Sequence, residues 1–114
     1  IERSKKFYDA LFAAIGGKPA ITDPKGRLIY MHNGGVFLVT KPINGEPAHH
    51  ANGGTIGFAV NDTAEADAWH KAGVANGGTA IEDPPGVRGE SPRQLYLAYL
   101  RVPDGNKICA MKRM

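Results

Sequence analysis

One stretch of this sequence decides the fold because the chain uses it twice, first as Gly16-Gly17-Lys18-Pro19-Ala20-Ile21-Thr22-Asp23-Pro24 and then as Gly77-Gly78-Thr79-Ala80-Ile81-Glu82-Asp83-Pro84. Each copy follows a segment with helical apolar spacing. Each is also followed by strand-like runs and a glycine turn, at Asn33-Gly34-Gly35 and at Asp104-Gly105-Asn106. Such a repeat indicates one supersecondary unit that occurs more than once. The chain is therefore predicted to consist of two similar modules in tandem.

The first module, residues 1–41, is predicted to contain one helix and three strands. Phe7, Leu11 and Ile15 share one stripe of a helix over residues 4–15. The Gly16-Gly17 pair ends this helix because glycine readily takes the left-handed cap conformation. Short runs rich in β-branched and aromatic residues predict an antiparallel meander of three strands, at residues 20–22, 28–32 and 36–40.

The second module, residues 54–114, follows a connection at residues 42–53 that is rich in Pro, Gly, Asn and His. A strand at 55–60 leads to a helix that begins at a capping box of Asp62 and Glu65 and continues to residue 76. Because the first module has no strand before its helix, we expect one to be missing in front of Ile1. Further strands are predicted at residues 80–82, 95–102 and 107–111, with a loop at 84–94.

The composition is that of one small globular domain spanning residues 1–114. A chain of 114 residues is too short for two independent cores, so the two modules have to share one. The net charge of +3 comes from scattered Lys and Arg side chains, which argues against nucleic-acid binding. A single cysteine excludes an internal disulfide and suits a reducing compartment. With no apolar run of membrane-spanning length, the sequence predicts a cytoplasmic protein that does not enter a membrane.

Two βαβββ modules with these turns resemble the vicinal oxygen chelate superfamily, which includes glyoxalase I, extradiol dioxygenases, bleomycin resistance proteins and fosfomycin resistance enzymes. The most specific match is Val102-Pro103-Asp104-Gly105-Asn106-Lys107-Ile108, which is similar to the family's turn before the last strand. Gly54-Thr55-Ile56-Gly57-Phe58-Ala59-Val60 and Ser4-Lys5-Lys6-Phe7-Tyr8 support it. The resemblance implies an α+β fold in which the two modules share a curled mixed sheet that forms a cup, and it implies a homodimer.

Metal-dependent members of this superfamily hold a divalent ion with His, Gln or Glu from the first and last strands of both modules. The corresponding positions here are Leu38, Thr55 and Cys109, and the fourth lies in the strand that we expect to be missing. Leucine has no donor atom, threonine is an uncommon ligand, and a lone thiolate is poorly suited to a hard ion. We therefore predict that the usual metal site is lost and that no cofactor is required.

The remaining prediction concerns the cup itself. Its expected ligand-binding residues carry aromatic rings and a few polar groups, the combination that small-molecule sites use. Arg88 and Arg93, in the long loop of the second module, are possible contacts for an anionic group because a guanidinium binds anions through two parallel hydrogen bonds. The predicted cup residues are Tyr30, His32, Thr55, Tyr99 and Cys109.

Three functions follow from this reading of the sequence. The favoured one is a small-molecule binder that resembles bleomycin resistance proteins and works without a metal. The alternatives are a metal-dependent glyoxalase-like lyase or dioxygenase, and a non-catalytic interaction scaffold. Whether the protein is an enzyme stays open at this point, since a nucleophilic pair of Cys109 and His32 is also conceivable. The chain has no G-x-S-x-G elbow, P-loop or complete G-x-G-x-x-G motif.

Overall fold

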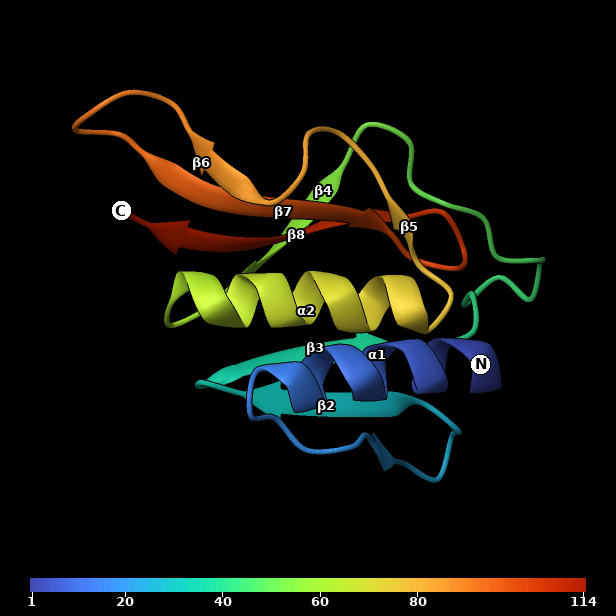
Figure 1. Cartoon of the computed structure of the whole chain (residues 1–114). Helices are drawn as coiled ribbons and strands as arrows, with labels where there is room; N and C mark the ends of the chain where they lie inside the picture. The colour runs from blue at the N-terminus through green and yellow to red at the C-terminus, as the bar shows by residue number, and fades with distance from the viewer.

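The computed structural model describes residues 1–114 and confirms the α+β fold with two related modules (Figure 1). In the first module, helix α1 (Glu2–Ala14) precedes three antiparallel strands in the order β1-β2-β3. Gly16, just past the helix, takes a positive φ of 82°, as predicted for the residue that ends it. The strand bounds are β1 (Ile21–Thr22), β2 (Leu28–His32) and β3 (Gly35–Val39).

The second module adds a strand before its helix and one after it. Strand β4 (Thr55–Ala59) leads to α2 (Thr63–Ala75), and Asp62 caps this helix by accepting a 2.7 Å hydrogen bond from the Glu65 backbone N–H. The sheet order is β4-β8-β7-β5, where β4 pairs in parallel with β8 and β7 pairs antiparallel with β8 and β5. The remaining strands are β5 (Thr79–Ala80), β6 (Gly86–Arg88), β7 (Leu95–Arg101) and β8 (Lys107–Arg113).

Strand β6 lies where the sequence predicted only a loop. It pairs antiparallel with β7, beyond β5 on the same edge. Its residues carry no local strand signal, because Gly86 opens the segment and prolines precede it. The segment becomes a strand because it pairs with β7, which begins at Leu95, later in the chain.

The helices and the two sheets share one core. Figure 1 shows α2 beneath the second sheet and α1 next to α2, in front of the first sheet. Trp69 on α2 and Phe7 and Leu11 on α1 are fully buried where these layers meet. An aromatic cluster continues between the two sheets, where the ring centroids of Phe37 and Phe58 lie 5.3 Å apart. Neither helix has the length and hydropathy that a membrane span needs.

The two sheets are not joined by backbone pairing. Strand β3 has only β2 as a neighbour, and β4 has only β8, so the curled sheet is open between β3 and β4. The predicted shared sheet is therefore two sheets, of three and five strands, that meet through side chains instead of hydrogen bonds.

A partly buried carboxylate ties the first sheet to α1 through hydrogen bonds. The Asp9 carboxylate accepts hydrogen bonds from Tyr30 Oη at 2.6 Å, Lys5 Nζ at 2.6 Å and the Ala20 backbone N–H at 3.1 Å. Burial by itself would raise the pKa of Asp9, but these bonds and the Lys5 charge outweigh it and hold the pKa below its ordinary value.

Replacing Asp9 with asparagine tests this bond. We expect Asp9→Asn to lower the free energy of unfolding by about 1–3 kcal/mol at pH 7, because the bonds to a charged acceptor are lost. Since the folded-state pKa is lowered, the stabilisation is present above the unfolded-state pKa and is lost as the pH falls through the folded-state value. Urea denaturation of both proteins over a pH series measures this. A difference that does not shrink toward acid pH would contradict the assignment.

Candidate functional site

The second sheet has one face that no helix covers. The register places Tyr99 opposite Cys109, Cys109 opposite Gly57, and Lys107 opposite Thr55. Because side chains alternate along a strand, these residues point away from α2, while Ile108 and Ala110 point into the core. We call this surface the helix-free face. It brings together three of the five residues that were predicted to form the cup, namely Thr55, Tyr99 and Cys109.

A cation lies over an aromatic ring on this face, at the start of β8. The Lys107 ammonium lies 4.8 Å from the centroid of the Tyr99 ring, within the range of a cation–π interaction. The same ammonium forms an ion pair with the Glu82 carboxylate, which follows β5. Glu82 has a positive φ of 58°, an uncommon conformation for a residue with a side chain. The predicted cup did not include Glu82 because its partner lies on a distant strand and no local pattern connects them.

The positive charge on this face exceeds the negative charge. By register, Arg88 pairs with Leu95, Arg101 pairs with Lys107, and Arg113 pairs with Leu95 from the other side, so all these cations point away from α2. Glu82 is the carboxylate that contacts the face. Arg101 is fixed by a 2.6 Å hydrogen bond from its Nη1 to the Gly105 carbonyl oxygen.

Cys109 lies beside this pair as a buried thiol. Burial raises its pKa; the nearby Lys107 charge lowers it and the Glu82 charge raises it, and the net shift is upward. A raised pKa disfavours the thiolate, which is the nucleophilic form of cysteine. His32 lies on the first sheet and faces α1, so the structure does not pair it with Cys109.

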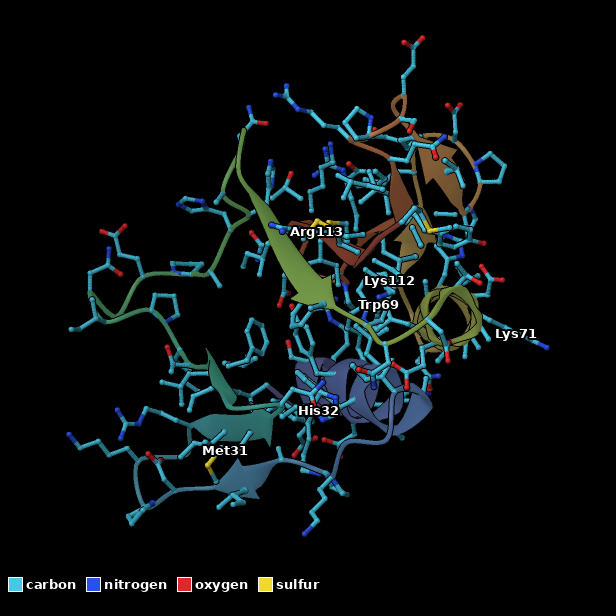
Figure 2. All side chains as sticks on the ribbon, turned by 90° about the vertical axis from the view of Figure 1, so that its left-hand side faces the viewer. Met31, His32, Trp69, Lys71, Lys112 and Arg113 are labelled. Atoms are coloured by element: carbon cyan, nitrogen blue, oxygen red, sulfur yellow. The ribbon has the colours of Figure 1, made fainter.

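Tyr30 and His32 lie on a different surface from the other predicted cup residues. The Tyr30 ring stacks on Phe12 with ring centroids 4.6 Å apart, and its hydroxyl bonds to Asp9 on α1. Figure 2 shows His32 beside α1, whereas Met31 lies on the other side of the strand. Leu38 pairs with Ile29 and not with Tyr30, so Tyr30 and His32 lie on the opposite face of the first sheet from Leu38. Their predicted contact with a ligand stays a prediction.

Comparison with known proteins gives the family. No family model and no curated protein matches the sequence. Among solved structures, a glyoxalase/bleomycin resistance protein from Albidiferax ferrireducens is 54% identical, with a TM-score of 0.90, and the match covers 96% of this chain and 88% of that chain. This chain belongs to the glyoxalase/bleomycin resistance family. The predicted membership in the vicinal oxygen chelate superfamily is thereby confirmed.

More distant members share the fold alone. A glyoxalase/bleomycin resistance protein/dioxygenase family enzyme from Burkholderia phytofirmans is 17% identical with a TM-score of 0.71, and the match covers 100% of this chain and 91% of that one. Lactoylglutathione lyase from Agrobacterium tumefaciens is 22% identical with a TM-score of 0.59, and the match covers 96% of this chain and 83% of that one.

The metal of this family does not fit the side chains present here. No group of three or more His, Cys, Asp or Glu side chains that could hold an ion occurs in the structure. Of the three positions that the resemblance assigns to metal ligands, Leu38 is apolar, Thr55 offers a neutral hydroxyl and Cys109 is a lone thiol. One hydroxyl and one thiol are fewer than the three or four protein donors that hold such an ion, and a lone thiolate is poorly suited to a hard ion.

The two loop arginines have different surroundings in this family member. The Arg88 guanidinium donates to the carbonyl oxygens of Gly86, Asp83 and Pro84, each at 2.9 Å, so it closes its own loop. The Arg93 side chain is exposed. Their predicted contacts with an anion stay predictions.

Proposed function

We propose that this domain binds a small aromatic carboxylate or a similar organic anion on the helix-free face, and that it does so without a metal ion. The observation that carries this proposal is the Lys107 ammonium over the Tyr99 ring, on a sheet face that no helix covers. A ring and a cation side by side suit a ligand that has both an aromatic part and a negative charge.

The surroundings support this ligand chemistry. Leu97 and Met111 pair with each other on the same face and add apolar surface next to Tyr99. The Thr55 hydroxyl lies at its edge and can donate or accept a hydrogen bond. The anionic part of a ligand would replace Glu82 as the partner of Lys107, and the excess of arginine side chains favours that exchange. In this proposal the ligand is held by side chains alone, because the family's metal positions carry no suitable donors.

Binding of a panel of aromatic carboxylates, measured by calorimetry with EDTA present, tests the proposal. We expect Lys107→Met and Tyr99→Leu each to weaken binding by at least about tenfold, since the ion pair and the ring contact are lost. Lys112→Met is the matched control, because Lys112 lies on the same strand and points to the opposite face. It should change affinity by less than about twofold.

The outcomes separate the alternatives. Binding that EDTA abolishes and that Zn²⁺ or Ni²⁺ restores would overturn the metal-free proposal and support the lyase or dioxygenase alternative. Equal affinities in Lys107→Met and Lys112→Met would show that the ligand binds elsewhere. Failure of every carboxylate to bind, with or without metal, would leave the interaction scaffold as the better description.

A further inference from the structure

Glu82 lies in the short segment between β5 and β6, and the backbone is held on both sides of it. Both strands pair with β7. Before Glu82, the Ile81 N–H donates a hydrogen bond to the Tyr99 carbonyl oxygen at 3.5 Å. After it, the Arg88 guanidinium donates one to the Asp83 carbonyl oxygen at 2.9 Å. The fold therefore fixes the position from which the Glu82 side chain extends.

Glu82 combines an uncommon backbone conformation with an accessible ion pair. Its positive φ of 58° is rare for a residue with a side chain, and such a conformation persists where the surrounding structure imposes it. The carboxylate pairs with the Lys107 ammonium, which lies over the Tyr99 ring. The side chains of Lys107 and Glu82 are 30% and 43% exposed. A dissolved ligand can therefore reach both partners of the ion pair.

The ion pair places an anion of the protein where an anionic ligand would bind. An exposed ion pair adds little to stability, so another carboxylate can take the place of Glu82 at small cost. The register places Arg101 opposite Lys107, so the face still attracts a second anion. Tethering, however, gives Glu82 an effective concentration on the order of millimolar or higher at Lys107. A carboxylate with no other contact has to exceed that concentration before it occupies Lys107.

An aromatic ring changes this competition. A ligand that carries a ring next to its carboxylate contacts Tyr99 as well as Lys107. Leu97 and Met111 add apolar surface on the same face. The Glu82 side chain has no ring to offer, so an aromatic carboxylate makes contacts that the tethered carboxylate does not.

We propose that Glu82 determines the specificity of the helix-free face, because its carboxylate occupies Lys107 until a ligand with both a negative charge and an aromatic ring displaces it. The inference rests on the proposed function, since it concerns the same site. Glu82 excludes small anions such as acetate and chloride, which compete for Lys107 but have no ring to place against Tyr99. The exchange replaces one carboxylate by another at Lys107, and the ring contact supplies the net affinity.

Calorimetry with benzoate and with acetate, in the presence of EDTA, tests the role of Glu82. We expect Glu82→Gln to tighten benzoate binding by at least about tenfold, because the tethered competitor is removed. Acetate should not bind measurably to the parent protein below about millimolar concentration, and it should bind measurably to Glu82→Gln. Glu82→Asn is a second variant, since asparagine tolerates a positive φ better than most residues. It should change both affinities in the same direction.

Two controls isolate the effect. Glu90→Gln changes the net charge by the same amount, and Glu90 is an exposed residue in the loop after β6 that takes part in none of the structure's ion pairs. It should change benzoate affinity by less than about twofold. In a Lys107→Met background, adding Glu82→Gln should not tighten binding, because the competitor acts only through Lys107.

The results separate this inference from the proposed function. Benzoate binding that needs Lys107 but is unchanged by Glu82→Gln would overturn the inference and leave the proposed function in place. Equal gains from Glu82→Gln and Glu90→Gln would also overturn it, since net charge alone would then explain them. Benzoate binding to Glu82→Gln but not to the parent protein would support both. Failure of benzoate and of the rest of the carboxylate panel to bind either protein would overturn both.

Discussion

Replacing Trp69 with alanine is expected to lower the free energy of unfolding by about 3–5 kcal/mol. Trp69 is 1% exposed and is among the largest fully buried side chains. It lies on α2, with its ring centroid 6.1 Å from that of Phe58, so its removal opens a cavity in the core that both modules share. A domain of this size has a total stability of about 5–15 kcal/mol, and the variant should therefore be only marginally folded.

Urea denaturation followed by circular dichroism measures this loss, because Trp69 is the chain's single tryptophan and its fluorescence disappears with it. Val74→Ala is the matched control. Val74 lies on the same helix and is 47% exposed, so its truncation should cost less than about 1 kcal/mol. If both variants lost the same stability, the assignment of Trp69 to a shared core would be wrong.

The features that the sequence predicted well are those with a strong local cause. Both helices were predicted because their apolar residues recur at helical spacing, and because glycine pairs and the Asp62 cap mark their ends. The order of elements was predicted from the repeat, because each copy of the glycine-rich stretch follows a helical segment and precedes strand-like runs. Strands β7 and β8 were predicted nearly to the residue, since the Asp104-Gly105 turn between them is a strong signal.

The sequence of the first module carries no comparable signal for which side chains of a strand face the core. The segment Leu28-Ile29-Tyr30-Met31 is apolar at every position, so it has no alternation that would tell the buried face from the exposed one. The structure buries Leu28 and Tyr30 and exposes Met31. In β8, by contrast, Cys109 of the predicted cup lies on the helix-free face, while its neighbours Ile108 and Ala110 point into the core.

The part of the candidate site that sequence reasoning missed depends on distant contacts. The Lys107–Glu82 ion pair joins the start of β8 to the segment after β5, and the two residues are far apart in the sequence of the second module. Only the three-dimensional packing of β5, β7 and β8 brings them together. In the same way, Arg88 was assigned to ligand recognition from its loop position, but its guanidinium hydrogen-bonds to the carbonyl oxygens of that loop.

Introducing valine at Gly73 is expected to destabilise the fold by about 2–3 kcal/mol or more, because this glycine packs tightly against Leu100 of β7 and Leu11 of α1. A Cβ at this position would lie 2.3 Å from Leu100 Cδ1 and 3.1 Å from Leu11 Cδ2. Both leucines are fully buried, so neither side chain has free space into which it can move.

Alanine at Gly73 provides the graded comparison. Its helix propensity favours the folded state by about 1 kcal/mol relative to glycine, but its Cβ meets the same two leucines. We expect the steric cost to exceed that gain, so that stability falls in the order glycine, alanine, valine. Ala68→Val is the matched control, because Ala68 is exposed in the middle of α2 and valine there costs only the propensity difference of about 0.6 kcal/mol. Thermal and urea denaturation give these differences. Equal losses at positions 68 and 73 would mean that α1, α2 and β7 are not in close contact at Gly73.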